Sequence, residues 1–365
     1  MSLPYYAVIM AGGGGTRLWP LSRLSRPKQL LPLLGGRSLF RVAVDRLRPL
    51  FDAEHTLVVC HAGLASRLRR EAPRLPRENF VIEPEPRNTA PAVALALAEI
   101  ERRGAPAAMA CLTADHYIQD EARFREVLGA AYRAAAAGHL VTLGIDPIAP
   151  VTGFGYIERG EPAGEFGGMT AHRVVAFKEK PDKEMAERFV ADGRHSWNSG
   201  MFVWTTERIR HEFSRQVPAL AEALNGLSAQ LGRRGSRAAL ARLWKRLPRQ
   251  SIDYAVMEGA RDVLVIPASG LGWADVGTWE SLLDIYARQP RLRGKPGVRR
   301  VDINSSGVEV VTDGVAGKLI ATIGMKDVVI VDTGDALLVC GRGASEEVRR
   351  LVRDLAEKRG TRTYL

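Results

Sequence analysis

The chain has few cysteines and no long hydrophobic run. Its 365 residues include three cysteines, Cys60, Cys111 and Cys340, each in or at the end of an apolar segment. Isolated cysteines in such settings are typical of core residues in a reducing compartment, and their number excludes a disulfide-rich secreted scaffold. No segment approaches the roughly 20 apolar residues of a membrane-spanning helix, and the N-terminus lacks a basic stretch followed by an apolar one. We therefore expect a cytoplasmic protein with no membrane partner.

Negative charge is in the minority. Lys and Arg number 52 against 41 Asp and Glu, which gives a net charge of +11, while hydrophobic and charged residues make up 46% and 25% of the chain. Those fractions are ordinary for a folded globular protein. The basic residues are scattered, many of them as Arg on Ala-rich helical stretches such as residues 233–249. Because no basic patch is interleaved with aromatic residues, nucleic acid is not the expected partner.

The first half of the chain alternates apolar strand-like runs with helical patterns. Alternation of this kind predicts an α/β fold with a largely parallel sheet, whose ligands bind in the loops at the carboxyl ends of the strands. The expected strands are 6–11, 55–60, 79–84, 107–115 and 139–145, and the expected helices are 38–50, 63–71, 89–103 and 121–137.

The second half changes character twice. Short strands and one helix occupy about 153–204, and helices dominate from 205 to 260. After Pro290 the chain becomes a series of short β-like runs with Gly and Asp turns, closed by a helix at about 345–359. The segment PRLRGKPG is typical of a linker. We therefore predict two domains, residues 1–290 and a small C-terminal β-rich domain at residues 291–365.

Four consecutive glycines, residues 12–15, follow the first expected strand. Glycines allow successive backbone N–H groups to face an anion without interference from Cβ atoms. Two familiar phosphate motifs do not fit the spacing. The dinucleotide fingerprint requires glycine where Leu18 stands, and the P-loop requires Lys and then Ser or Thr where Thr16 and Arg17 stand. A tight turn between a strand and a helix is the alternative explanation.

The longer string around these glycines resembles the sugar-phosphate nucleotidyltransferases. That family carries Gly-Gly-x-Gly-Thr-Arg-Leu-x-Pro-Leu followed by Pro-Lys, and residues 12–21 with Pro27 and Lys28 match it. Further segments, RNTAPAVALA, TADHYI, FKEKP, WNSGMFVW and GWADVGTWESL, are similar to the mannose-1-phosphate guanylyltransferase branch. The resemblance covers nearly the whole chain. It implies a Rossmann-like nucleotidyltransferase domain with a mainly parallel mixed sheet, and a small β-helix-like C-terminal domain.

The resemblance implies an enzyme that transfers GMP from GTP to mannose 1-phosphate, giving GDP-mannose and pyrophosphate. The attacking sugar phosphate is already ionised, so the reaction needs positioning and charge neutralisation rather than a general base. Arg17 and Lys28 are the implied catalytic cations. The implied nucleotide-binding residues are Gly12, Gly13, Gly14, Gly15, Thr16, Asn88 and Thr89. Asn88 and Thr89 also suit the cap of a helix, so this pair does not separate the two interpretations.

The family places a metal-binding Asp at Asp115 and at Asp275, and the implied cofactor is Mg²⁺. Without the family, Asp115 is equally a turn residue at a strand end, and Asp275 could be an N-cap before a helix near Thr278. Thr113 stands where the family more often has Pro, which leaves the carboxylate unchanged. His116 is interpreted as a structural neighbour of the metal-binding Asp.

The sugar side is expected from the middle of the chain. Glu179 and Asn198 would bind sugar hydroxyls, Lys180 would bind the sugar phosphate, and Gly153 and Gly155 would let the backbone approach the sugar. Without the family, a Lys-Glu-Lys run is more often the solvated end of a strand.

Three other functions remain open at this point. One is a pyrophosphorylase for another sugar 1-phosphate or nucleotide, another is a non-catalytic nucleotide-sugar sensor, and the third is a basic nucleic-acid binder. The sensor predicts loss of Arg17, Lys28 or a metal-binding Asp, and all are present. About 75 residues after the linker are too few for a further fused isomerase domain, so we expect no isomerase activity. The small C-terminal domain is expected to mediate a homodimer.

Overall fold

The structure is a computed structural model that describes residues 3–13, 15–104, 106–233, 235, 237–293, 298–313 and 318–365. Gly14, one of the predicted phosphate-loop residues, therefore lies outside the described residues. The chain divides into two compact units. The first unit comprises Met1–Gly12, Val44–Thr113 and Ile118–Trp273, and the second comprises Gly13–Ala43, Ala114–Tyr117 and Ala274–Leu365.

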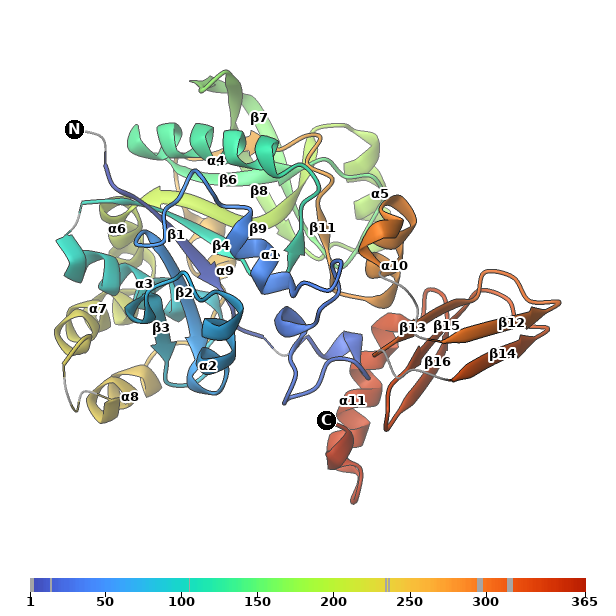
Figure 1. The fold of residues 1–365 in the computed structure, drawn as a ribbon. Coiled ribbons are helices and arrows are strands. Elements are labelled where there is room, and N and C mark those ends of the chain that lie inside the picture. Colours follow the sequence, from blue (N-terminus) through green and yellow to red (C-terminus); the bar gives the residue numbers. More distant parts are fainter. Residues whose placement is uncertain are drawn as a thin grey trace. The chain divides into compact units, whose positions relative to one another are not determined.

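A nine-stranded sheet in the order β3-β2-β1-β4-β9-β6-β10-β8-β7 forms the centre of the first unit (Figure 1). Its strands are β1 Tyr5–Met10, β2 Thr56–His61, β3 Phe80–Glu83, β4 Ala108–Thr113, β6 Leu140–Ile145, β7 Gly155–Phe166, β8 Met169–Glu179, β9 His195–Thr205 and β10 Val263–Pro267. Strands β8 and β9 run opposite to the other seven. The sheet is therefore mixed and mainly parallel, as predicted.

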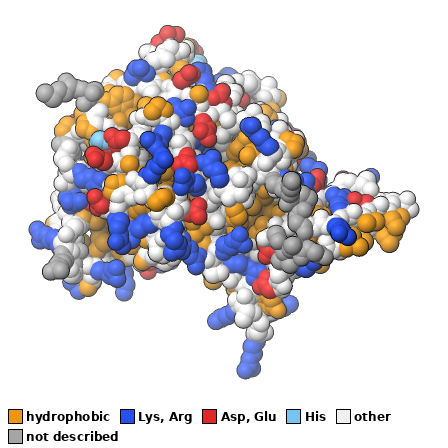
Figure 2. Space-filling view, viewed as in Figure 1, with side chains coloured by type: hydrophobic (Ala, Val, Ile, Leu, Met, Phe, Trp, Pro, Cys, Tyr) orange, Lys and Arg blue, Asp and Glu red, His pale blue; other side chains and the backbone are white. Residues whose placement is uncertain are grey.

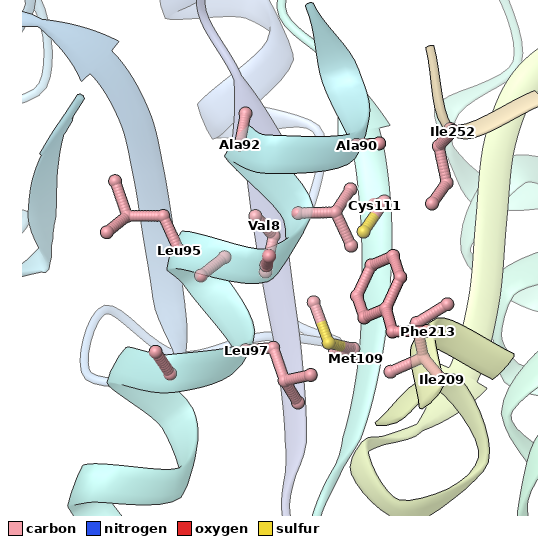
Figure 3. Packing of buried hydrophobic residues seen from close by; sticks show 14 of the residues in the cluster. Val8, Ala90, Ala92, Leu95, Leu97, Met109, Cys111, Ile209, Phe213 and Ile252 are labelled. Atoms are coloured by element: carbon pink, nitrogen blue, oxygen red, sulfur yellow. The ribbon is translucent and has the colours of Figure 1, made fainter. Parts of the chain in front are cut away.

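Helices cover the sheet of the first unit because its central strands are apolar on both faces. The helices are α2 Ala62–Glu71, α3 Thr89–Gly104, α4 Glu121–Ala136, α5 Lys183–Ala191, α6 Thr206–Gln216, α7 Pro218–Gln230, α8 Arg237–Lys245 and α9 Ile252–Ala255. Helix α3 presents Leu95 and Leu97 to a core that includes Val8, Met109 and Phe213 (Figure 3). This packing holds α3 against strands β1 and β3.

The second unit contains the C-terminal β domain and residues 13–28, which carry most of the family motif and are called the signature loop below. Its elements are the 3-10 turns η1 Thr16–Leu18 and η2 Lys28–Leu30, the start of α1 Leu39–Asp45, β5 His116–Tyr117, β11 Ala274–Asp275, α10 Trp279–Arg288, β12 Arg299–Ile303, β13 Glu309–Thr312, β14 Leu319–Ile323, β15 Val328–Asp332, β16 Leu337–Gly341, η6 Ser345–Glu347, α11 Val348–Glu357 and η7 Arg362–Tyr364. Helix α1 is shorter than the predicted 38–50, because Pro49 removes a backbone donor and disfavours helix at the residue before it.

The C-terminal strands form a coil with a constant repeat. Arg299 lies opposite Leu319 in the parallel pair β12–β14, and Glu309 lies opposite Val329 in the parallel pair β13–β15. Each residue is thus paired with the one twenty positions later, because the chain completes one turn of a β-helix between them. Strand β16 then closes the coil antiparallel to β15.

One hydrophobic cluster within the second unit joins the signature loop to this domain. It contains Leu18 and Trp19 from the loop, Trp279 from α10, and Val329 and Val331 from β15, all of them buried. The indole Nε1 of Trp279 donates to the Trp19 carbonyl at 3.1 Å. No helix of the described residues combines the length and apolarity that a membrane crossing requires.

Candidate active site

Three predicted residues from distant parts of the sequence meet in the second unit. The Nζ atom of Lys28 lies 2.9 Å from Oδ2 of Asp115 and 3.2 Å from Oδ1 of Asp275. The Lys28 side chain is buried, whereas the two carboxylates are partly exposed. The structure thus brings together one proposed catalytic cation and both proposed metal ligands.

Short elements explain why the carboxylates converge. Strand β5 pairs antiparallel with β11, and Asp275 lies opposite His116, the residue after Asp115. The N-cap of α10 is Thr278, whose hydroxyl accepts from the Ser281 amide at 3.3 Å in a capping box. Asp275 is therefore not the N-cap that the sequence left open, and its carboxylate faces Lys28 instead.

The opposite charges in this cluster shift the pKa values of Asp275 and Lys28 in favour of their charged forms. Burial alone would raise the pKa of Asp275, but the Lys28 ammonium, with contributions from His116 and Arg17, lowers it to about 2. Burial would lower the pKa of Lys28, but Asp115 and Asp275 outweigh it and raise this pKa above its usual value. The shifts of Lys28 and Asp275 both favour the charged forms, as expected when opposite charges lie within hydrogen-bonding distance.

The two carboxylates fit a magnesium ion. Both offer carboxylate oxygens, and because each contacts the same Lys28 Nζ the two side chains are neighbours. Mg²⁺ is typically bound by one or two carboxylates together with substrate phosphates and water. A larger all-protein cage is absent, since no group of three or more His, Cys, Asp or Glu that could hold a metal ion occurs in the described part of the chain.

The signature loop wraps around Lys28. Gly15 has a positive φ of 59°, and a Cβ at this position would overlap the Lys28 side chain. Arg17 donates from Nη1 to Oε1 of Glu346 at 2.7 Å. Its Nη2 approaches Gly277 so closely that a Cβ there would lie 2.9 Å away. Thr16 begins the turn η1, and Gly13 (φ 92°) accepts from Gln29 through its carbonyl at 3.3 Å.

The predicted sugar-binding residues form a second group, within the first unit. Gly155 lies opposite Glu179 in the β7–β8 pairing, and a Cβ on Gly155 would overlap the Glu179 carboxylate. Glu179 forms an ion pair with Lys180, whose φ of 46° is left-handed. Asn198 lies in β9, and its Cβ would be 3.3 Å from a Cβ on Gly155. Gly153 lies in the turn before β7, apart from these contacts.

Asp253 is a candidate that the sequence analysis missed. The Asn198 side chain donates from Nδ2 to Oδ1 of Asp253 at 2.8 Å. Burial raises the pKa of Asp253, and nearby Glu179 acts in the same direction. The aromatic rings of Phe154, Trp197 and Trp273 pack near one another, with centroid separations of 5.1 to 6.3 Å. Aromatic residues in the quoted motif WNSGMFVW were the available signal for the ring cluster, and Asp253 lay outside every motif.

Asn88 and Thr89 begin α3 and serve its local structure. Asn88 has a φ of 69°, and its side-chain oxygen accepts from the Thr89 amide at 2.9 Å. The Thr89 hydroxyl accepts from the Ile252 amide at 2.8 Å and so joins α3 to α9. Neither bond is the bond to the second or third helical amide that defines an N-cap, so these contacts do not confirm the capping interpretation, and base contact remains a proposal.

Glu83 is a second acidic residue that the sequence analysis missed. It ends β3, is 4% exposed, and lies 3.8 Å from where a Cβ on Gly12 would stand. Burial raises the pKa of Glu83 to about 7. Its only sequence signal was its position at the carboxyl end of a predicted strand.

Comparison with known proteins identifies the family. The model described as nucleotidyl transferase matches residues 6–290, more than half of the chain. The chain belongs to the nucleotidyl transferase family. A second model, described as a MannoseP isomerase/GMP-like beta-helix domain, matches residues 298–355 of this nucleotidyl transferase. That description agrees with the twenty-residue coil of the C-terminal strands.

Individual relatives agree with the family. The mannose-1-phosphate guanylyltransferase of Escherichia coli (strain K12) is 38% identical over 361 residues, which cover 96% of this chain and 73% of the relative. A solved structure from Thermus thermophilus, named as a mannose-1-phosphate geranyltransferase, has a TM-score of 0.82 at 34% identity and covers 97% of this chain and 100% of its own. A solved mannose-6-phosphate isomerase from Helicobacter pylori has a TM-score of 0.61 at 25% identity, over 75% of this chain and 100% of its own. The predicted family and fold class are confirmed.

The tight fit of Gly15 generates a stability prediction for this nucleotidyl transferase. Gly15→Ala should lower the free energy of unfolding by about 2 kcal/mol. The new Cβ would overlap Lys28, and the alanine would have to adopt a strained positive φ. Gly13→Ala is the matched control, since its φ is also positive but no atom of the described residues lies within 4 Å of the added Cβ. Thermal unfolding of both variants would measure the difference. Equal losses in the two variants would show that backbone strain alone matters.

Glu83 generates a pH prediction. Its pKa of about 7 in the folded protein exceeds the usual 4.5, so the unfolded chain releases this proton at lower pH than the folded chain. The contribution of Glu83 to the free energy of unfolding is complete below the pKa that this carboxyl has in the unfolded chain. It is lost as the pH rises through the pKa that the carboxyl has in the folded protein. Glu83→Gln cannot ionise, so its Tm relative to the wild type should rise between about pH 5 and pH 8. The exposed Glu184→Gln, on α5, is the control. A pH-independent difference for Glu83→Gln would contradict the assignment.

Proposed function

We propose that this chain transfers GMP from GTP to mannose 1-phosphate, giving GDP-mannose and pyrophosphate. The observation that carries the proposal is the cluster of Lys28, Asp115 and Asp275 beside the Arg17 loop, in a nucleotidyl transferase whose relatives include named mannose-1-phosphate guanylyltransferases. GTP and mannose 1-phosphate are the proposed substrates and Mg²⁺ the proposed cofactor.

The reaction is a single in-line displacement. An oxygen of the mannose phosphate forms a bond to the α-phosphorus of GTP, and the bond from that phosphorus to the bridging oxygen of pyrophosphate breaks. Pyrophosphate leaves with the electron pair. The attacking oxygen carries no proton at neutral pH, so the chain needs no general base, and His116 has no proton-transfer role.

The residues of the second unit act on the phosphates. Lys28 offers a point charge, and the planar guanidinium of Arg17 offers several donors to phosphate oxygens. Gly13 and Gly15 leave the loop backbone bare, so that N–H groups can face an anion. Asp115 and Asp275 would hold Mg²⁺, which when bound neutralises charge on the phosphates.

The residues of the first unit act on the sugar. Glu179 is an acceptor for hydroxyl groups, while Asn198 has both a donor and an acceptor, with its amide orientation held by Asp253. Lys180 carries the positive charge that a sugar phosphate requires. Gly155 is required next to Glu179 because any side chain there would displace the carboxylate. Asn88 and Thr89 at the start of α3 are the proposed base contacts.

A pyrophosphate-release assay tests the function. The purified protein with Mg²⁺ is supplied with GTP, ATP, UTP or dTTP, each combined with mannose, glucose or N-acetylglucosamine 1-phosphate. We expect turnover with GTP and mannose 1-phosphate. A different preferred pair would keep the phosphate site and refute the base and sugar assignments. Binding of nucleotide without turnover would favour the sensor.

The carboxylate pair generates a mutational prediction. Asp115→Asn and Asp275→Asn should each lower kcat on the order of 100-fold or more, since each removes a charged ligand for the metal. The Mg²⁺ concentration needed for half-maximal rate should rise in any residual activity. Asp284→Asn is the control, because Asp284 is exposed on α10 and pairs with Arg342 at 3.2 Å. A normal rate in either site variant would remove that residue from the metal site.

The oligomeric state generates another prediction. Strands β12 and β14 expose Val301, Ile303, Leu319 and Ile323, whose exposed fractions are 47% to 69% (Figure 2 shows hydrophobic side chains over these strands). Apolar side chains gathered on two paired strands suit burial against a second copy. We expect a dimer by light scattering, and a monomer for the double variant Ile303→Asp, Ile323→Asp. Leu24→Asp, at an exposed leucine outside these strands, should stay dimeric. An unchanged mass for the double variant would refute this interface.

A further inference from the structure

The signature loop is bonded to the C-terminal part of the chain at three points. Arg17, Trp19 and Arg23 each form a hydrogen bond or ion pair with a residue beyond position 330. All of these residues belong to the second unit. The family motif explains the loop residues by their expected contacts with phosphate, and it does not account for these partners.

Arg23 makes the most extensive of these connections. Its Nη1 and Nη2 atoms lie 3.2 Å and 2.8 Å from the two carboxylate oxygens of Asp335. Nη1 also donates to the Tyr364 carbonyl at 2.7 Å, and Nε donates to the Pro20 carbonyl at 2.6 Å. The Arg23 side chain is 11% exposed. A bidentate, largely buried guanidinium of this kind fixes geometry better than a single surface ion pair.

Trp19 connects the same loop to the C-terminal turn. Its indole Nε1 donates to the Tyr364 carbonyl at 2.7 Å, so that one carbonyl accepts from both Trp19 and Arg23. The guanidinium of Arg23 also lies over the Trp19 ring, 5.6 Å from its centroid. These contacts anchor the loop a few residues after Arg17.

Glu346 contacts Arg17 itself, and its turn is fixed by α10. Its Oε1 accepts from Arg17 Nη1 at 2.7 Å. The carboxylate of Glu280, on α10, accepts from the Gly343 amide at 2.7 Å and from the Ser345 amide at 3.3 Å. Helix α10 begins at Trp279, four positions after Asp275. The partner of Arg17 is therefore held by the helix that begins beside one of the proposed metal ligands.

We propose that the C-terminal β domain positions the signature loop of its own chain, with Glu346 orienting the guanidinium of Arg17 and with Asp335 and the Tyr364 carbonyl anchoring the loop behind it. Glu346 is a positioning residue, and its effect on turnover rests on the proposed function. The anchoring of the loop does not.

The Arg17–Glu346 ion pair is suited to orient the Arg17 side chain rather than to stabilise the fold. The Glu346 side chain is 62% exposed and that of Arg17 34%, and exposed pairs contribute little to folding. An Arg has five N–H donors, and Glu346 occupies one at Nη1. The other donors can still meet phosphate oxygens. Holding the side chain in one orientation before substrate binds reduces the entropy lost on binding.

Kinetics of Glu346→Gln test the orientation. We expect kcat/KM for GTP to fall about tenfold, with an unchanged Tm and an unchanged KM for mannose 1-phosphate. Glu347→Gln is the matched control, because Glu347 lies on the same turn and pairs with Arg350, at 3.9 Å, rather than with Arg17. In an Arg17→Ala background the Glu346 substitution should have no further effect. Equal effects of the two Glu variants, or a full effect without Arg17, would overturn the assignment of Glu346.

Hydrogen exchange tests the anchor independently of activity. In Asp335→Asn we expect faster amide exchange in peptides covering residues 15–26, with unchanged exchange in β1 as an internal control. Unchanged exchange in the loop would overturn the anchoring. If the wild-type protein turns over no sugar phosphate, the proposed function fails, and this experiment still decides whether the C-terminal domain holds the loop.

Discussion

The ammonium of Lys28 between two carboxylates is the interaction on which the rest of the site depends. A buried ammonium without partners would be costly, and Asp115 and Asp275 remove that cost. Several features of the second unit follow from it. Gly15 must lack a side chain because Lys28 fills the space beside it. The short pair β5–β11 holds the two carboxylates together, and Thr278 caps α10 so that Asp275 is not needed there.

The sequence predicted the fold class because its signals are local. Apolar runs and helical periods placed α3 and α4 within a residue or two of their observed ends. The sequence analysis set no bounds for strand β12, all five of whose residues are exposed. It is a strand because the coil places it opposite β14. Residues 300–303 alternate polar and apolar side chains, but so short a run does not by itself set the ends of a strand, which depend on pairing with residues twenty positions away.

In the candidate site, too, some residues could be predicted from local sequence motifs and others only from the structure. Lys28, Asp115 and Asp275 could be named in advance because each lies in a long motif, although only the structure shows that they touch. Asp253 and Glu83 could not, since their importance comes from burial. Asp253 is half-buried and accepts a hydrogen bond from Asn198, which lies 55 positions away. On the face shown in Figure 2, the side chains of Lys and Arg are scattered and mixed with those of Asp and Glu.

Charge balance connects the cluster with its proposed substrate. Lys28 and Arg17 carry two positive charges, and their partners Asp115, Asp275 and Glu346 carry three negative ones, so the five groups sum to −1. A nucleoside triphosphate adds several further negative charges to this cluster. A divalent cation on the carboxylates would compensate part of that charge and leave Lys28 without its two anionic partners. Phosphate oxygens are then the natural acceptors for its ammonium. The same ion pairs that stabilise the loop therefore prepare its cations for the polyphosphate.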